Sequence, residues 1–291
     1  MENTLIQIYL FVCQIYDTCS DSCFQRISNN CQPDFTDQEL ITIWLFAHLN
    51  DRFRKNQMHA FIKNYWSDWF PRLPSYQSFV YRLNKLESSF QTLGGKLLES
   101  LSVKTAFETD AIIDSMPVML AAQGHSYTAR VAREIADSGF CAAKKTRFHG
   151  VRLHFIARRK SASLPVPAQI WLCAGSVHDS KAFVEQQINL PATSLFGDLA
   201  FAGKRLADWL ADQQTKLLMG KKKPQGKELS ETDKYHNRLI AKFRQPIESL
   251  FNWIIEKTGI QKASKVRSTD ALLIHCWGKL VVALYLLVFY Y

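Results

Sequence analysis

The chain has 291 residues, enough to bury a sizeable core in one large domain or two small ones. Its hydrophobic fraction of 47% and charged fraction of 21% are ordinary for a soluble globular protein and give no sign of a fibrous or disordered chain. The formal net charge of +10 favours a polyanionic partner, and nucleic acid is the leading candidate.

The excess of positive charge lies in the second part of the chain. Residues 1–100 contain nine Lys or Arg and ten Asp or Glu, a net charge of −1. Of the totals of 36 basic and 26 acidic residues, 27 and 16 therefore remain for residues 101–291, a net charge of +11. A basic surface is expected mainly in that second part.

The seven cysteines suggest a reduced compartment, because their number is odd and no secretory signal precedes them. We therefore expect a cytoplasmic protein. Four of them, Cys13, Cys19, Cys23 and Cys31, could suggest a zinc site. Their spacing lacks a paired C-x-x-C motif, so ordinary thiols on helices are the preferred interpretation.

The first hundred residues are predicted to be helical. Thr36 and Glu39 form a capping box, which predicts a helix that begins there and ends near Leu49. Met58 to Trp69 repeat apolar residues at helical spacing, and Pro71 ends that element. Ser75 can cap a third helix with a buried stripe made of Tyr76, Phe79, Leu83 and Leu86.

The opposite face of this third helix carries polar and basic residues that could contact DNA, above all Gln77, Arg82 and Lys85. Three short helices with such a final helix indicate a helix-turn-helix-like module. A plain helical bundle with a solvated face explains the pattern equally well, because this region as a whole is not basic.

From about residue 107 the pattern changes to alternating strands and helices. Ala111 to Ile113 form a short apolar strand ending in Asp114, and residues 151–157 and 168–174 predict two neighbouring strands. A helix over 179–188, a strand leading into Asp198, a helix over 203–212 and a strand over 216–219 follow. This order is that of a ribonuclease-H-like α/β core, followed by a final helical region.

Two aspartates lie at comparable places, each at the carboxyl end of an apolar strand. A sheet presents side chains to a crevice at such ends, so Asp114 and Asp198 could share one site if their strands are adjacent. A third acid, Glu248, lies roughly 115° from the centre of the apolar stripe of its helix, whereas Glu256 lies about 165° away. Glu248, one turn after Arg244, can therefore lean toward the sheet.

Three carboxylates suit a hard divalent cation such as Mg²⁺ or Mn²⁺, which prefers oxygen ligands. Two such ions can hold the attacking and leaving oxygens of a phosphoryl transfer. Taken singly, an aspartate after a strand is more often a turn or cap residue, and a glutamate on a helix is usually solvated. The order Asp, Asp, Glu on strand, strand and helix is what favours a metal site.

Several basic segments could contact DNA phosphates, although solvated turns explain them nearly as well. They are the loop residues Lys221, Lys222 and Lys223, the residues Lys144, Lys145 and Arg147 before the second strand, and Arg130 with Tyr127 and Arg133 after Asp114. His178-Asp179 after a strand could polarise a reacting group, but a helix cap by Asp179 is the simpler interpretation. His154 is expected to be a packing residue.

Five blocks of the sequence resemble the conserved blocks of bacterial insertion-sequence transposases of the DDE class, and most closely those of insertion-sequence family 982. These blocks are Ile112–Pro117, Gly150–His154, Ser176–Asp179, Phe196–Phe201 and Arg244–Phe251. The Arg-x-x-x-Glu spacing of Arg244 and Glu248 matches part of a signature of related transposases. Two further positions of that signature differ here, because Ala241 replaces the expected tyrosine and Ile255 the expected lysine.

This resemblance implies a helical DNA-binding region over residues 1–100 and a ribonuclease-H-like catalytic domain over residues 101–291. It implies that Asp114, Asp198 and Glu248 bind Mg²⁺ or Mn²⁺ and cut and rejoin double-stranded DNA at inverted-repeat ends. It also implies a homodimer or a higher synaptic complex on DNA. A structure-specific nuclease on the same core and a non-catalytic DNA-binding derivative remain as alternatives.

The last apolar stretch, Leu280 to Tyr291, has about a dozen residues, whereas a membrane-spanning helix needs ~20. A longer stretch that begins earlier in the chain would include the polar residues Lys279 and His275. We therefore predict a buried helix and no membrane partner.

Overall fold

The computed structural model describes residues 1–18, 25, 33–104, 109–142, 144–160, 163–186, 194–226 and 228–291, and the chain forms two compact units. The first unit combines Met1–Ser100 with Ile254–Tyr291, and the second is Leu101–Trp253. Residues 254–291, expected in the catalytic domain, thus pack with the first hundred residues, while the functional boundary at residue 100 stays a prediction. Cys19, Cys23 and Cys31 of the suggested zinc group lie outside the described residues.

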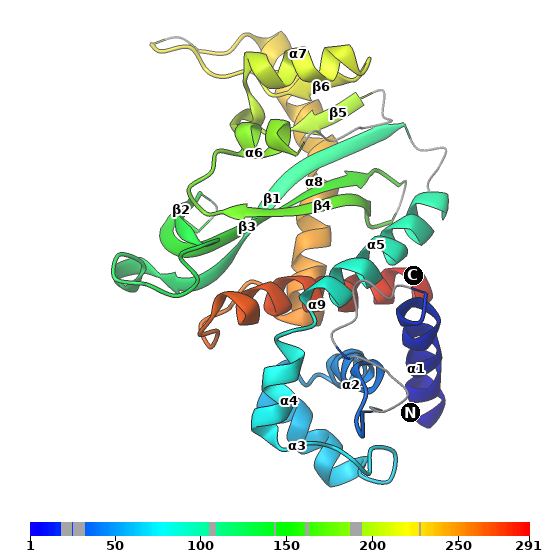
Figure 1. Cartoon of the computed structure of the whole chain (residues 1–291). Helices are drawn as coiled ribbons and strands as arrows, with labels where there is room; N and C mark the ends of the chain where they lie inside the picture. The colour runs from blue at the N-terminus through cyan, green and yellow to red at the C-terminus, as the bar shows by residue number, and fades with distance from the viewer. Residues whose placement is uncertain are drawn as a thin grey trace. The chain divides into compact units, whose positions relative to one another are not determined.

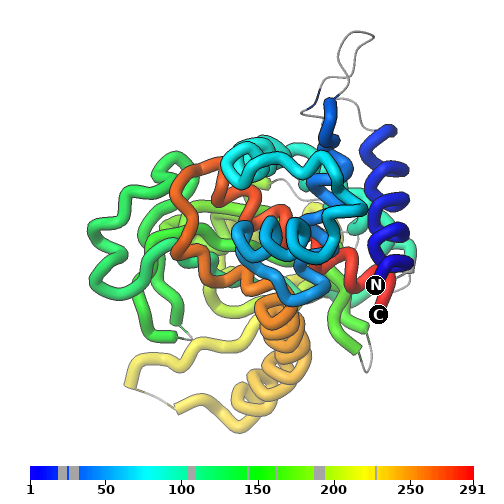
Figure 2. Tube along the Cα trace, turned by 90° about the horizontal axis from the view of Figure 1, so that it is seen from below, coloured from blue at the N-terminus to red at the C-terminus, as the bar shows by residue number. Residues whose placement is uncertain are grey.

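The first unit is helical (Figure 1). Its helices are α1 (Glu2–Tyr16), α2 (Asp37–Leu49), α3 (Lys55–Tyr65), α4 (Tyr76–Leu83), most of α5 (Glu87–Lys104), the last turn of α8 (Glu231–Thr258) and α9 (Thr269–Phe289). The carboxyl-terminal end of α9 lies beside α1 (Figure 2). Between these helices, Phe11 contacts the rings of Tyr285 and Phe289.

Helix α2 is the central helix of this unit, and nearly all of it is buried. The predicted capping box is confirmed, because Thr36 accepts a hydrogen bond from the Glu39 amide while the Glu39 carboxylate accepts one from the Thr36 amide. Trp44 donates to the Gly278 carbonyl of α9 at 2.9 Å. A Cβ atom at Gly278 would lie only 2.9 Å from the Trp44 ring, so glycine permits this close approach of the two helices.

The predicted cap at Ser75 is also confirmed, since its hydroxyl accepts from the Ser78 amide at the start of α4. Phe79, Leu83 and Leu86 are buried as expected, but Tyr76 is 41% exposed. Arg82, predicted to lie on an exposed face where it could contact DNA, forms an ion pair of 2.9 Å with the fully buried carboxylate of Asp37. This arginine therefore holds the start of α2 inside the unit. The helix-turn-helix character of α2–α4 stays a prediction.

Helix α9 is longer than expected and, at 21 residues, is long and apolar enough to cross a membrane. The length argument from the sequence was therefore wrong: the helix begins at the Ser268 cap and includes His275 and Lys279. Most of its apolar window is buried inside the protein, as in the core helix of a soluble protein. The predicted buried helix is supported by this packing.

Two histidines and a lysine are enclosed in this unit. The Nδ1 of His48 donates to the Trp44 carbonyl, His275 donates to the Ile260 carbonyl, and Lys279 donates to the Thr258 carbonyl at 2.7 Å. Burial lowers the pKa of His48 and of His275 to about 3, and the positive charge of Lys279 adds to both shifts. Burial likewise lowers the pKa of Lys279 to about 8.

These histidines should make the helical unit sensitive to mild acid. Between about pH 6.5 and 3 these two histidines are protonated in the unfolded chain but neutral in the folded protein. The free energy of unfolding therefore decreases as the pH falls below about 6.5. At about 1.4 kcal/mol per pKa unit, each histidine costs roughly 2 kcal/mol at pH 5. Urea unfolding followed by tryptophan fluorescence at pH 7.5 and 5 should show this loss. His48→Gln should reduce the pH dependence, and the exposed His125→Gln should leave it unchanged; equal pH dependence in all three proteins would contradict the prediction.

The second unit is built on a six-stranded mixed sheet. Its strands are β1 (Asp110–Ala122), β2 (Asp137–Cys141), β3 (Thr146–Arg158), β4 (Val166–Ala174), β5 (Ser194–Gly197) and β6 (Lys216–Met219). Both β2 and β4 pair with β3, and the order continues β3-β1-β5-β6. The β1–β5 and β5–β6 pairs are parallel, whereas the others are antiparallel.

Two layers of helices cover this sheet. Helices α6 (Asp179–Glu185) and α7 (Lys204–Asp212) pack on the face that carries Ile113 and Ile156. The opposite face meets α8, where Phe155 contacts Phe251 and Phe196 stacks on Phe243. The strand–helix order predicted from the sequence is confirmed, with β2 and two short 3-10 turns, Gln123–Ser126 and Leu199–Phe201, as additions.

Strand β1 is much longer than predicted. It continues beyond Asp114 to Ala122 because β3 is equally long and pairs with it from Arg158 back to Phe148. Gly150 permits the closest approach in this pair, since a Cβ atom there would lie 2.1 Å from the Val118 carbonyl oxygen. Asp114 therefore lies within a strand, and alternation places Asp114 on the α8 face and Ser115 on the α6 face.

Candidate active site

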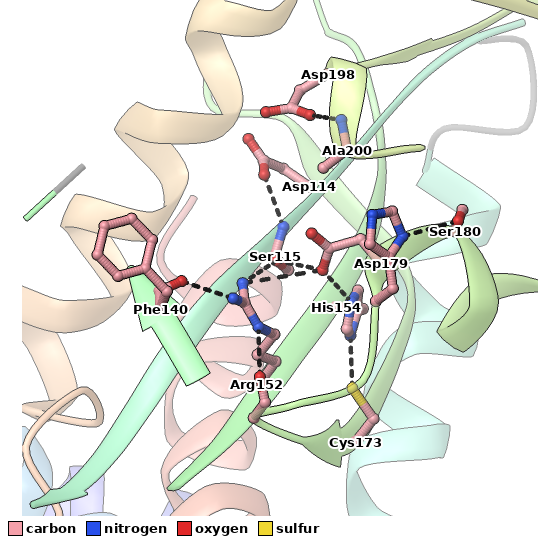
Figure 3. Close-up of polar contacts among 12 residues, drawn as sticks. Asp114, Ser115, Phe140, Arg152, His154, Cys173, Asp179, Ser180, Asp198 and Ala200 are labelled. Atoms are coloured by element: carbon pink, nitrogen blue, oxygen red, sulfur yellow. Dashed lines mark hydrogen bonds and ion pairs between the residues drawn. The ribbon is translucent and has the colours of Figure 1, made fainter. Parts of the chain in front are cut away.

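Asp114 and Asp198 lie side by side because their strands are parallel neighbours in register. Ile112 pairs with Phe196, and each aspartate lies two residues further along its strand or just beyond it. Adjacent strands are about 4.8 Å apart, so the two carboxylates reach the same place. Asp198 directly follows β5 and caps the next turn, where its side chain accepts from the Ala200 amide (Figure 3).

A single guanidinium faces both aspartates. Nη2 of Arg244, on α8, lies 3.2 Å from Oδ2 of Asp114 and 3.9 Å from Oδ2 of Asp198. The Asp114 side chain is 21% exposed and that of Asp198 is 42% exposed. Oδ1 of Asp114 accepts the amide of Ser115 at 2.8 Å, so only Oδ2 is directed at the positive charge.

The site concentrates negative charge. Burial raises the pKa of Asp114 to about 6, with repulsion from Asp198 and Asp179 adding to it, while Arg244 and the Ser115 amide act in the opposite direction. A raised pKa at a partly enclosed carboxylate pair is typical of a functional site. A positive charge at Oδ2 therefore favours the charged form of Asp114, as Arg244 does here.

Glu248 lies one turn after Arg244 on α8 and is exposed. Its helix has the predicted apolar stripe, because Ile247, Leu250, Phe251 and Ile254 are buried. Within the described part of the chain, no three His, Cys, Asp or Glu side chains are close enough to hold one metal ion. The structure therefore brings Asp114 and Asp198 together but leaves Glu248 outside that pair.

A second polar cluster lies on the α6 face, directly behind Asp114. Oδ1 of Asp179 accepts hydrogen bonds from Nε2 of His154 at 2.8 Å and from the Ser115 hydroxyl at 3.0 Å, and Nη1 of Arg152 lies 3.9 Å away (Figure 3). Asp179 was expected to cap α6, but the cap residue is His178 and it makes no side-chain cap bond. The cap interpretation was therefore wrong.

His154 is fully buried, as expected for a packing residue, but it also has a polar role. A carboxylate only accepts, so Nε2 of His154 carries the proton that it donates to Asp179. Burial raises the pKa of the Cys173 thiol to about 12, so this thiol keeps its proton and faces Nδ1 of His154 at 3.6 Å. The ring stacks on Trp171.

One signal for this cluster is visible in the sequence, because Ser115 directly follows Asp114. In the structure Ser115 is paired with His154 across β1 and β3. That pairing depends on the register of two long strands, and local periodicity could not supply it.

A family model for the transposase DDE domain matches residues 105–285, well over half of the chain. The chain belongs to this family. No curated protein and no solved structure matched it in the other two comparisons. DDE transposases have a ribonuclease-H-like core, act on DNA and generally use divalent metal ions, and the mixed sheet with its helices agrees with that core.

The basic residues expected to bind DNA lie in several places on this transposase. Arg130, Lys144, Lys145 and Arg147 are exposed around the β2–β3 hairpin. Lys221 pairs with Asp233 at 2.5 Å, while its neighbours Lys222 and Lys223 are exposed.

In the helical unit of the transposase, Gln77 is exposed and Lys85 pairs with Asp270 at 2.7 Å. Arg82 forms an ion pair with Asp37, and Arg244 faces the carboxylate pair of Asp114 and Asp198. Two exposed aromatic rings, Tyr127 and Phe140, lie in the same part of the second unit as the basic residues around the β2–β3 hairpin. Phe140 is the cross-strand partner of Arg147. Phe140 was not singled out from the sequence.

Proposed function

We propose that this protein is the transposase of an insertion sequence, most similar to insertion-sequence family 982, and that it cleaves and joins DNA strands at the ends of that element. Asp114, Asp198 and Glu248 are the proposed metal-binding carboxylates, and Mg²⁺ or Mn²⁺ is the proposed cofactor. The observation that carries this proposal is the carboxylate pair of Asp114 and Asp198, in register on neighbouring parallel strands and facing one cation.

The residues of the pair fit a hard divalent cation. Their Oδ2 atoms are oxygen donors directed at a shared positive charge, and both side chains are partly open to solvent. When bound, such ions activate the attacking oxygen and stabilise the departing oxygen of a phosphoryl transfer. Glu248 is the proposed third donor, supported by its position one turn after Arg244.

Arg244 offsets part of the negative charge of the carboxylate pair. A cation at the pair would compete with this guanidinium, which could then hold a DNA phosphate through its planar donors. Arg244 would thus position the DNA backbone beside the two aspartates.

The exposed basic residues are proposed to bind the DNA backbone, and this proposal predicts a strong salt dependence. Each lost phosphate contact should lower the magnitude of the negative slope of log K against log salt by about 0.9. Lys222→Ala combined with Lys223→Ala should therefore reduce the magnitude of the slope by about 2 in a binding titration by fluorescence anisotropy.

Lys181→Ala is a suitable control, because this exposed lysine on α6 pairs with Glu185 instead. It should leave the slope unchanged. A slope that stays the same in the Lys222/Lys223 variant would mean that this loop does not touch the DNA backbone.

Three further features complete the proposal. The helices α2–α4 are proposed to form a helix-turn-helix-like module that recognises the element ends, with Gln77 and Lys85 at the DNA. The protein is proposed to act as a dimer or larger synaptic complex on double-stranded DNA. It is expected to work in the bacterial cytoplasm, as transposases of this family typically do.

The decisive experiment incubates the full chain with duplex DNA that carries the terminal inverted repeats flanking its gene, with Mg²⁺, Mn²⁺ or EDTA. We expect metal-dependent nicks at the repeat ends and, with a target plasmid, joined products. Cleavage without joined products would support a structure-specific nuclease. End binding without cleavage in either metal would support a non-catalytic DNA-binding protein.

A further inference from the structure

The Asp179 cluster makes a continuous chain of contacts to the candidate metal-binding carboxylate of Asp114. Oδ1 of Asp179 accepts the Ser115 hydroxyl at 3.0 Å, and the Ser115 amide donates to Oδ1 of Asp114 at 2.8 Å. Oδ2 of Asp114 is the oxygen that remains directed at Arg244. Ser115 therefore links one carboxylate on the α6 face to another on the α8 face.

Asp179 is itself fixed from several sides. His154 and Arg152 approach it from β3, and both are mostly buried. Arg152 is held in turn by the carbonyls of Gly175 and Phe140, at 3.2 and 2.7 Å. An anion surrounded by such donors is rigid, and the Ser115 hydroxyl that it binds is consequently rigid as well.

We propose that Asp179 is a positioning residue for Asp114: through Ser115 it sets the orientation of the Asp114 carboxylate, so that Oδ2 is presented to the divalent cation. This inference rests on the proposed function. Asp179 touches neither the cation nor DNA in this scheme. Its role corresponds to that of the outer partners of metal ligands, whose loss typically weakens metal affinity or activity about 10–100-fold.

The test measures Mn²⁺ binding to the full chain without DNA, by electron paramagnetic resonance, beside metal-dependent cleavage. Ser115→Ala removes one hydroxyl but keeps the backbone amide. We expect about 10-fold weaker Mn²⁺ binding or more, a higher Mn²⁺ requirement for cleavage and an unchanged KM for DNA. Ser115→Thr keeps a hydroxyl and should recover both properties. Lys181→Ala, elsewhere on α6, should match the wild type.

A double-variant cycle separates this chain of contacts from a general structural effect. If Asp179 acts through Ser115, Asp179→Ala combined with Ser115→Ala should bind Mn²⁺ no more weakly than Asp179→Ala alone. Additive losses would overturn the proposal, as would wild-type Mn²⁺ affinity in Ser115→Ala. If Asp179→Ala does not fold, the comparison of Ser115→Ala with Ser115→Thr decides, and equal Mn²⁺ affinities in those two overturn the proposal.

Failure of the proposed function would look different. In that case the wild type itself would bind Mn²⁺ no better than Asp114→Asn and would not cleave end-containing DNA. Wild-type binding and cleavage with no effect of Ser115→Ala would leave the transposase function in place and remove only the positioning role.

Discussion

Asp114→Asn and Asp198→Asn should each lower metal-dependent DNA cleavage by about 1000-fold or more while leaving the fold and the affinity for DNA nearly unchanged. A metal ion contributes several kcal/mol to such a transition state, and every 1.36 kcal/mol is about tenfold in rate. Each substitution removes a charged oxygen donor but keeps the size of the side chain. Single-turnover cleavage of end-containing DNA, with thermal unfolding and anisotropy in parallel, measures all three properties.

Asp208→Asn is the matched control for these variants. Asp208 is exposed on α7 and makes no part of the carboxylate pair, so its variant should cleave like the wild type. Near-wild-type cleavage in either Asp114→Asn or Asp198→Asn would exclude that aspartate as a metal ligand.

The second large effect is expected at Glu248. Glu248→Gln should reduce cleavage by about 100-fold or more and weaken divalent-cation binding, because the neutral amide is a poor ligand for a hard cation. The same helix offers a control with identical chemistry. Glu256 is also exposed, but it lies in the helical unit beyond the division of the chain at residue 254 and contacts Lys257. Glu256→Gln should leave both properties unchanged.

Cleavage and Mn²⁺ affinity measured for both glutamine variants distinguish the two acids. A loss of activity in Glu256→Gln together with full activity in Glu248→Gln would show that the third ligand was assigned wrongly. Full activity in both variants would mean that Asp114 and Asp198 work with a different third donor.

The elements that follow from local sequence were predictable. Capping at Thr36 and Ser75, the neighbouring strands β3 and β4, and the apolar stripe of α8 all depend on residues a few positions apart. The proximity of Asp114 and Asp198 required one further step, the assumption that their strands are adjacent, and the pairing of β1 with β5 confirms it.

Features that depend on distant partners escaped prediction. Arg82 was predicted to contact DNA or solvent because its partner Asp37 lies 45 residues earlier in the chain. Asp179 was assigned to a cap because its partners Ser115 and His154 are on other strands. The length of α9 was underestimated because Lys279 was taken to interrupt its apolar stretch, whereas its ammonium donates to the carbonyls of Thr258 and Gly259 at the end of α8.

The helical unit is made from two segments of the chain, Met1–Ser100 and Ile254–Tyr291, with the whole second unit between them. During synthesis at about 5–20 residues per second, the first hundred residues therefore precede α9 by roughly 10–30 seconds, and α2 packs on α9 through Trp44 and Gly278. All six strands of the second unit have been synthesised before α9 begins. A chain terminated before α9 would contain Asp114 and Asp198 but would lack part of the helical unit. Only the fully translated chain therefore contains both the carboxylate pair and a complete helical unit.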